Sequence, residues 1–252
     1  MLGADSSDGA GAELANAPVL ASAPSSPSAG QSAPSRWRRP SPPRAVKTAD
    51  IGDDNFHPTH PLMSDTSIDS ISAFRATQRA HLLTARAGLV ADAALQLQFA
   101  THLMSVLRQL MPERLGIYSA VRSEFDAAAI CVAAPELADT PFALPFSLLE
   151  PRRMDFRHWD RRPLTTRDDC RILAPDGPVV VPDVVLAPCV GYTASGWRLG
   201  YGGGYFDRWM AEHPHVTVVG VAWSVGEIDE ALWKPQPHDR ALACVVTERG
   251  VV

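Results

Sequence analysis

The sequence has few cysteines, no long apolar run and no excess of basic residues. Its four cysteines, Cys131, Cys170, Cys189 and Cys244, show no CxxC spacing, so neither a disulfide framework nor a zinc site is indicated, and a reducing cytoplasm is expected. No apolar stretch approaches the roughly 20 residues that span a bilayer, so we expect no membrane partner. The formal net charge of −5 argues against a nucleic-acid partner, because nucleic-acid binders usually carry a basic face.

The first sixty or so residues differ in composition from the rest of the chain. The stretch SAPSSPSAGQSAPSRWRRPSPPRAVK is rich in Pro, Ser, Ala and Gly and has no periodic apolar positions. Such a segment buries too little apolar surface to offset its ordering entropy, so we predict a disordered low-complexity tail over residues 1–66. An alternative interpretation is that the natural chain starts at Met63, which opens the sequence MSDTSIDS. The folded domain is predicted over residues 67–252.

From about residue 71 onward the apolar positions become regular. Helical spacing predicts helices over residues 69–89 and 95–110, from about 126, and over 205–212. Apolar runs predict buried strands over residues 114–121, 141–147, 179–191, 216–223 and 241–247. Helices that alternate with continuous apolar strands predict a single three-layer α/β domain with a central, mostly parallel sheet.

The glycine-rich stretch GWRLGYGGGYFDRWM, residues 196–210, is the most distinctive motif in the chain. Gly200, Gly202 and Gly204 give the spacing G-x-G-x-G, which differs from the G-x-G-x-x-G of dinucleotide-binding folds. No acidic ribose partner follows the strand predicted over 216–223, which disfavours a nicotinamide oxidoreductase. The Gly-Lys-Ser/Thr of a P-loop is missing as well, which excludes that class.

Two physical features of this glycine loop favour an anion. Consecutive glycines can present successive backbone N–H groups to one ligand, and the segment then opens a helix whose N-terminal dipole attracts negative charge. Arg198 adds a positive charge before Gly200, and the carboxylate of Asp207 could hold Mg²⁺ against phosphate oxygens. A phosphate cradle and an ordinary tight turn both remain open on this ground alone.

The motif RLGYGGGYFDR, preceded by VVLAPCVGY and followed by PQPHDRALACVVTE, resembles the 5-formyltetrahydrofolate cyclo-ligase family, also called methenyltetrahydrofolate synthetases. The resemblance runs from about Arg75 to the C-terminus. It implies an α/β ligase that forms a C–N bond: with ATP and Mg²⁺ it converts 5-formyltetrahydrofolate to 5,10-methenyltetrahydrofolate and releases ADP and phosphate. ATP and a reduced folate are therefore the expected partners, and we expect a monomeric, cytoplasmic enzyme.

The resemblance also implies roles for individual residues. The implied ATP ligands are two arginines of the first predicted helix and the glycine loop: Arg75, Arg79, Arg198, Leu199, Gly200, Tyr201, Gly202, Gly203, Gly204, Tyr205 and Phe206. The implied folate contacts are Glu124, Met154, Phe156, Trp159, Gly202, Gly203, Gly204 and Tyr205. Arg198 and Tyr205 are the implied catalytic residues, and Asp207 and Asp239 the implied Mg²⁺ ligands. His238 is either a general acid or base or a solvent-exposed loop residue.

Three positions depart from the family's usual pattern. Thr193 stands where an Asp is usual, Ala174 stands where a Glu is usual, and a usual Gln is missing around Gly226. These departures leave an alternative hypothesis open: a divergent member that binds nucleotide or folate as a regulatory or interaction protein without turnover.

Overall fold

The computed structural model describes residues 65–252, with only the backbone described for residues 65–68. The alternative start at Met63 and the predicted tail, apart from its last two residues, lie outside the described residues. Residues 65 and 66 already belong to the first helix. No helix in the described part of the chain is long and apolar enough to cross a membrane.

The four predicted helices are confirmed. They are α1 (Asp65–Ala85), α2 (Ala93–Leu110), α3 (Ala127–Ala133) and α4 (Tyr205–Glu212). Local sequence sets the starts of α2 and α3, because short carboxylates cap exposed backbone N–H groups: Asp92 accepts hydrogen bonds from the N–H groups of Ala94 and Leu95 before α2, and Asp126 accepts one from Ala129 in α3. Short 3-10 turns occupy residues 89–91, 135–137, 224–226 and 230–232.

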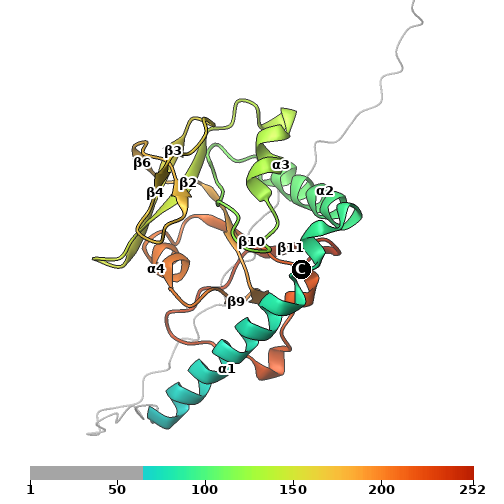
Figure 1. Cartoon of the computed structure of the whole chain (residues 1–252), viewed down its shortest axis with the longest axis vertical. Helices are drawn as coiled ribbons and strands as arrows, with labels where there is room; N and C mark the ends of the chain where they lie inside the picture. The colour runs from blue at the N-terminus through green and yellow to red at the C-terminus, as the bar shows by residue number, and fades with distance from the viewer. Residues whose placement is uncertain (1–64) are drawn as a thin grey trace, which may run out of the picture. The chain divides into compact units, whose positions relative to one another are not determined.

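An eight-stranded sheet forms the centre of the fold, in the order β12-β11-β10-β7-β1-β2-β3-β6 (Figure 1). Its strands are β1 (Leu115–Gly116), β2 (Phe142–Leu148), β3 (Arg153–Trp159), β6 (Val179–Val180), β7 (Val184–Pro188), β10 (Thr217–Val221), β11 (Cys244–Thr247) and β12 (Gly250–Val251). The five strands from β11 to β2 pair in parallel, while β12, β3 and β6 add antiparallel edges. Two further pairs are β4 (Thr166–Arg167) with β5 (Leu173–Ala174) and β8 (Gly191–Tyr192) with β9 (Arg198–Leu199). The predicted mostly parallel sheet is confirmed.

The run over residues 179–191, predicted as one strand, is three separate strands. Pro182 has no backbone N–H for a ladder, so the run breaks before β7. β6 then pairs antiparallel with β3 at the sheet edge, whereas β7 lies in the middle between β1 and β10. The predicted strand over 114–121 is likewise reduced to β1, and the residues after it leave the sheet.

Helices cover both faces of the sheet, because consecutive strand residues point to opposite sides. In β7, Val184 and Leu186 pack in one core with α2 and α3. Val185 and Ala187 pack in a second core with α4, which lies away from α2 and α3 in Figure 1. This arrangement confirms the three-layer prediction. A third, smaller cluster seats α1 beside the glycine loop and consists of Leu82, Val190, Leu199, Ile228 and Trp233.

Gly116 in the central strand β1 is closely surrounded by neighbouring side chains. A Cβ there would lie 2.9 Å from atoms of both Phe156 and Val185. We therefore expect Gly116→Val to lower the free energy of unfolding by about 1–3 kcal/mol through overpacking, measured by urea denaturation. Gly88→Ala is the control, because nothing lies within 4 Å of an added Cβ and the backbone there is right-handed helical. Equal stability of the two variants would contradict this packing account.

Candidate active site

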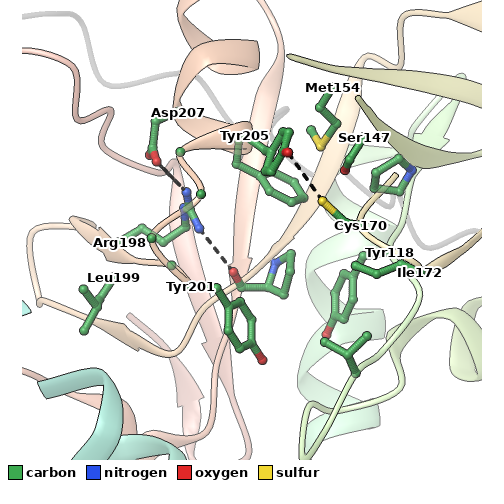
Figure 2. Close-up of a pocket in the computed structure, with 18 of the residues that line it drawn as sticks. Tyr118, Ser147, Met154, Cys170, Ile172, Arg198, Leu199, Tyr201, Tyr205 and Asp207 are labelled. Atoms are coloured by element: carbon green, nitrogen blue, oxygen red, sulfur yellow. Dashed lines mark hydrogen bonds and ion pairs between the residues drawn. The ribbon is translucent and has the colours of Figure 1, made fainter. Parts of the chain in front are cut away.

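A cavity of about 880 Å³ lies where β1 and β7 end. In parallel sheets this edge is the usual ligand site, and the volume is within the range of small-molecule pockets. Its walls come from α1, the segment after β1, the turn between β4 and β5, and the glycine loop with the start of α4. Figure 2 shows the glycine-loop side chains Arg198, Tyr201 and Tyr205 facing Tyr118, Cys170 and Ile172 across this space.

The glycine loop has a backbone that side chains would disturb. Gly202 and Gly204 have φ values of 93° and 65°, in the left-handed region that glycine tolerates. A Cβ on Gly202 would lie 3.3 Å from the guanidinium carbon of Arg79, and one on Gly200 would lie 2.4 Å from Nη1 of Arg198. The glycines therefore let two arginines approach the loop backbone closely.

Arg198, at the start of the loop, is bound to Asp207 beyond it. Nη2 of Arg198 lies 3.0 Å from both carboxylate oxygens of Asp207 (Figure 2). Nη1 donates to the backbone oxygen of Pro188, and the Arg198 side chain is only 5% exposed. A buried guanidinium requires such a counter-charge, since an unpaired buried charge is very unfavourable. The ion pair thus neutralises a cation beside the loop.

Arg75 and Asp239 form a second buried ion pair in the cavity wall. The guanidinium donates to the two carboxylate oxygens at 3.1 and 2.5 Å, and it lies 4.4 Å from the ring centre of Trp233. Burial alone would raise the pKa of Asp239, but hydrogen bonds from Arg75 and from the Gln236 N–H hold it below its ordinary value. The Asp239 carboxylate is therefore ionised in the folded protein near neutral pH.

Arg79, one helical turn after Arg75, provides a further cation. Its Nε donates to the backbone oxygen of Gly200 at 2.7 Å. Burial and the neighbouring charge of Arg75 both lower the pKa of Arg79. Two guanidinium groups that lie this close repel each other, and a bound anion would relieve the repulsion. This wall is thus suited to phosphate.

The carboxylates suit Mg²⁺ only together with a phosphate. Asp207 and Asp239 both line the cavity, and each is bound to an arginine. Among residues 65–252 no cluster of three or more metal-ligating side chains is present. Mg²⁺ is commonly held by one or two carboxylates plus substrate phosphates and water, which is the donor set these two residues can offer.

Glu124 is a further buried carboxylate in the wall of the same cavity. It is 5% exposed, and its two oxygens accept hydrogen bonds from the hydroxyl of Tyr201 at 2.7 Å and from the N–H of Val121 at 2.8 Å. Burial raises the pKa of Glu124, although these hydrogen bonds and the charges of Arg86 and Arg122 oppose the shift. The site therefore combines the arginines beside the glycine loop with a third carboxylate, which accepts a hydrogen bond from Tyr201 of that loop.

Two predicted folate contacts are not part of this cavity. Met154 lines it, but Phe156 lies deeper on the same face of β3, fully buried against the ring of Trp209. Trp159 lines a separate cavity of about 380 Å³. The other predicted site residues all line the main cavity, as does exposed His238.

Sequence reasoning missed several residues of the site. Tyr118 and Cys170 line the cavity, and the thiol of Cys170 donates to the hydroxyl of Tyr205 across 3.4 Å (Figure 2). Neither residue belongs to a motif, so only the three-dimensional contact reveals them. Arg86 lies near the end of the first predicted helix without belonging to any motif, yet it is almost fully buried and donates to the hydroxyl of Tyr201.

The three departures from the family pattern contribute no side chain to the main cavity. Thr193 is fully buried, and its hydroxyl accepts a hydrogen bond from the N–H of Trp197 within the β8–β9 turn. Ala174 is buried beside the smaller cavity. Gly226 packs against the chain, since a Cβ there would lie 2.9 Å from the backbone oxygen of Val190.

Known proteins match the chain in family and in fold. The profile of the 5-formyltetrahydrofolate cyclo-ligase family matches residues 71–248. No curated protein sequence matches this chain. A 5,10-methenyltetrahydrofolate synthetase structure from Aquifex aeolicus superposes with a TM-score of 0.58 at 22% identity, covering 71% of this chain and 91% of that one. A synthetase of the same name from Mycoplasma pneumoniae gives 0.52 at 19% identity, covering 68% and 97%.

These two structures support the fold, because their sequence identities are low. The family match is decisive for membership, since it spans well over half of the chain and includes the whole cavity wall from α1 to Asp239. It also confirms the predicted enzyme class, a ligase. The chain belongs to the 5-formyltetrahydrofolate cyclo-ligase family.

Proposed function

We propose that this chain uses ATP and Mg²⁺ to convert 5-formyltetrahydrofolate to 5,10-methenyltetrahydrofolate, releasing ADP and phosphate. Family membership supplies the cyclo-ligase class. The observation that carries the proposal is that one cavity is lined by the glycine loop, by the arginines beside it and by the buried carboxylate of Glu124. A triphosphate suits the loop and the arginines, and the N–H groups of a pterin suit the carboxylate.

The proposed reaction has two steps. The formyl oxygen attacks the γ-phosphorus of ATP, so a new O–P bond forms while the bond to ADP breaks. N10 of the folate then attacks the formyl carbon and loses its proton, and the C–O bond to phosphate breaks. Both steps develop negative charge on phosphate oxygens, which fixed cations and N–H groups stabilise.

The arginines that line the cavity can meet this demand by exchanging their carboxylate partners for phosphate. In the folded protein Arg75 and Arg198 are bound to Asp239 and Asp207. We propose that the ATP phosphates compete for these guanidinium groups and for Arg79, while the two carboxylates hold Mg²⁺. The metal would neutralise phosphate charge. Tyr205 is the first residue of α4, directly after the glycine loop, and is our candidate for contact with the transferred phosphoryl group.

We also propose a monomeric, cytoplasmic enzyme. All four cysteine thiols are free, which suits a reducing compartment.

The direct test is to incubate the purified protein with 5-formyltetrahydrofolate and Mg-ATP. We expect the methenyl product to appear by absorbance, together with one ADP for each product formed. ATP binding without product, from mildly acidic to neutral pH, would favour the alternative of a binding protein without turnover and reject the proposal.

Asp207→Asn should reduce kcat/KM by about 10²–10³-fold while the protein stays folded, because the neutral amide holds neither Arg198 nor Mg²⁺ as a carboxylate does. Steady-state kinetics with varied Mg²⁺, and circular dichroism for folding, provide the measurement. Asp160→Asn is the matched control, since it removes an exposed ion pair with Arg162 outside the main cavity. Near-normal activity of Asp207→Asn would show that Asp207 is not a metal ligand.

Because of Glu124, folate binding should weaken as pH falls, and this weakening is the acid limb of the binding curve. An ionised carboxylate accepts hydrogen bonds, and it loses that capacity as pH falls through its pKa. Because burial raises this pKa, the loss should occur above the ordinary glutamate value of 4.5. We expect the dissociation constant of 5-formyltetrahydrofolate to rise as pH falls, while Glu124→Gln binds weakly and without this limb. Isothermal titration measures both, and an unchanged limb in the variant would assign it to another group.

A further inference from the structure

Arg86 is a buried cation outside the wall of the main cavity. It follows the last residue of α1 and is only 2% exposed. Transfer of a guanidinium from water into a protein interior is unfavourable unless its N–H groups and its charge are satisfied. The partners of Arg86 therefore indicate why the chain holds a charge there.

Each direct partner of Arg86 is a neutral oxygen. Nε donates to the hydroxyl of Ser123 at 3.1 Å, Nη1 donates to the backbone oxygen of Cys189 at 3.2 Å, and Nη2 donates to the hydroxyl of Tyr201. Within residues 65–252 no carboxylate lies within ion-pair distance of this guanidinium. Arg86 is connected to a negative charge through Tyr201, because the hydroxyl of Tyr201 donates to Glu124 at 2.7 Å.

This order of donors fixes the direction of the hydrogen bonds. A guanidinium can only donate, so the oxygen of Tyr201 accepts from Arg86. The single hydrogen of the phenol is then available for Glu124, which receives it on Oε1. The N–H of Val121 binds Oε2, so the carboxylate is held at both oxygens. Each oxygen keeps a further lone pair for a ligand.

Two cations lie close to the Tyr201 ring. The guanidinium carbons of Arg86 and Arg122 lie 5.7 and 5.3 Å from the ring centre. Both distances are within the range of cation–π attraction. These two contacts and the hydrogen bonds of the hydroxyl group hold the ring in position, and that position determines where the hydrogen bond to Glu124 is made.

We propose that Arg86 is a positioning residue for folate binding: through Tyr201 it orients the Glu124 carboxylate and keeps it ionised. This inference rests on the proposed contact between Glu124 and the folate. The titratable and charged groups that act on Glu124 are Arg86, Arg122, Tyr201, Tyr118 and Cys189. Of these, the two arginines carry charge near neutral pH. Arg86 is the buried one, so solvent screens its effect least.

The test compares Arg86→Gln, Arg86→Lys, Tyr201→Phe and the double variant Arg86→Gln/Tyr201→Phe. For each, isothermal titration gives the dissociation constants of 5-formyltetrahydrofolate across pH and of Mg-ATP at neutral pH. We expect Arg86→Gln to weaken folate binding about tenfold and to move its acid limb upward by about one pH unit, with ATP affinity unchanged. Arg86→Lys, which can still donate to the phenol, should restore most of the affinity.

Non-additivity separates positioning from a loss of packing. Because Tyr201 connects Arg86 to Glu124, Tyr201→Phe should produce a similar shift, and the double variant should show little more than the larger single effect. Tyr201 is 37% exposed, so its truncation to Phe tests the proposal even where Arg86→Gln does not fold. Arg108→Gln, an exposed arginine on α2, is the control and should bind as the wild type does.

Other outcomes separate this inference from the proposed function. An unshifted acid limb in Tyr201→Phe, or equal losses of folate and ATP affinity in Arg86→Gln, would overturn the role of Arg86. If Glu124→Gln weakens folate binding while Tyr201→Phe does not, only the positioning role fails. If Glu124→Gln itself binds folate normally, the proposed contact is wrong and the inference falls with it.

Discussion

The cavity depends on one ion pair that closes the glycine loop. Arg198 lies in β9 before the loop and Asp207 in the first turn of α4 after it, and their side chains meet at 3.0 Å. A chain with several glycines loses much conformational entropy when it becomes ordered, so it needs a firm attachment at both ends. The pair provides that attachment and faces its charges toward the space where a polyanion would bind. Gly202 and Gly204, with left-handed backbone, let the loop turn between these two fixed ends.

The same chemical arrangement recurs around the cavity. Three buried arginines each have an acidic counterpart: Arg198 has Asp207, Arg75 has Asp239, and Arg86 reaches Glu124 through a phenol. Every carboxylate that the family resemblance connects with a ligand is therefore also the counter-charge of a protein cation. A ligand that binds the arginine of such a pair leaves the carboxylate without its counter-charge, and a ligand that binds the carboxylate leaves the arginine without one. Under the proposed function, ATP and metal together satisfy both members.

Much of this organisation could be predicted from the sequence where the signal was local. Helical spacing located the four helices, and the glycine motif located the loop and its flanking charges. The break at Pro182 was missed because the apolar run continues through it, and the pairing of β6 with β3 depends on a distant strand. Phe156 and Trp159 could not be placed, since the face and depth of a strand residue depend on what packs over it. Arg86 was invisible for the same reason: its partners lie 37 to 115 residues away in the chain.

The small cluster that seats α1 has a thermodynamic consequence. Three arginines of the site, Arg75, Arg79 and Arg86, belong to this helix or directly follow it. Its apolar anchorage is a satellite cluster, separate from the two cores that hold the sheet. The free energy needed to open an element locally rises with the number of apolar contacts that it makes. Undocking α1 therefore costs less free energy than opening the sheet. A ligand that binds Arg75 and Arg79 binds only the docked helix, and its binding free energy therefore adds to the stability of that one element. Any fraction of molecules in which this helix is undocked would lower the apparent affinity of the site in proportion.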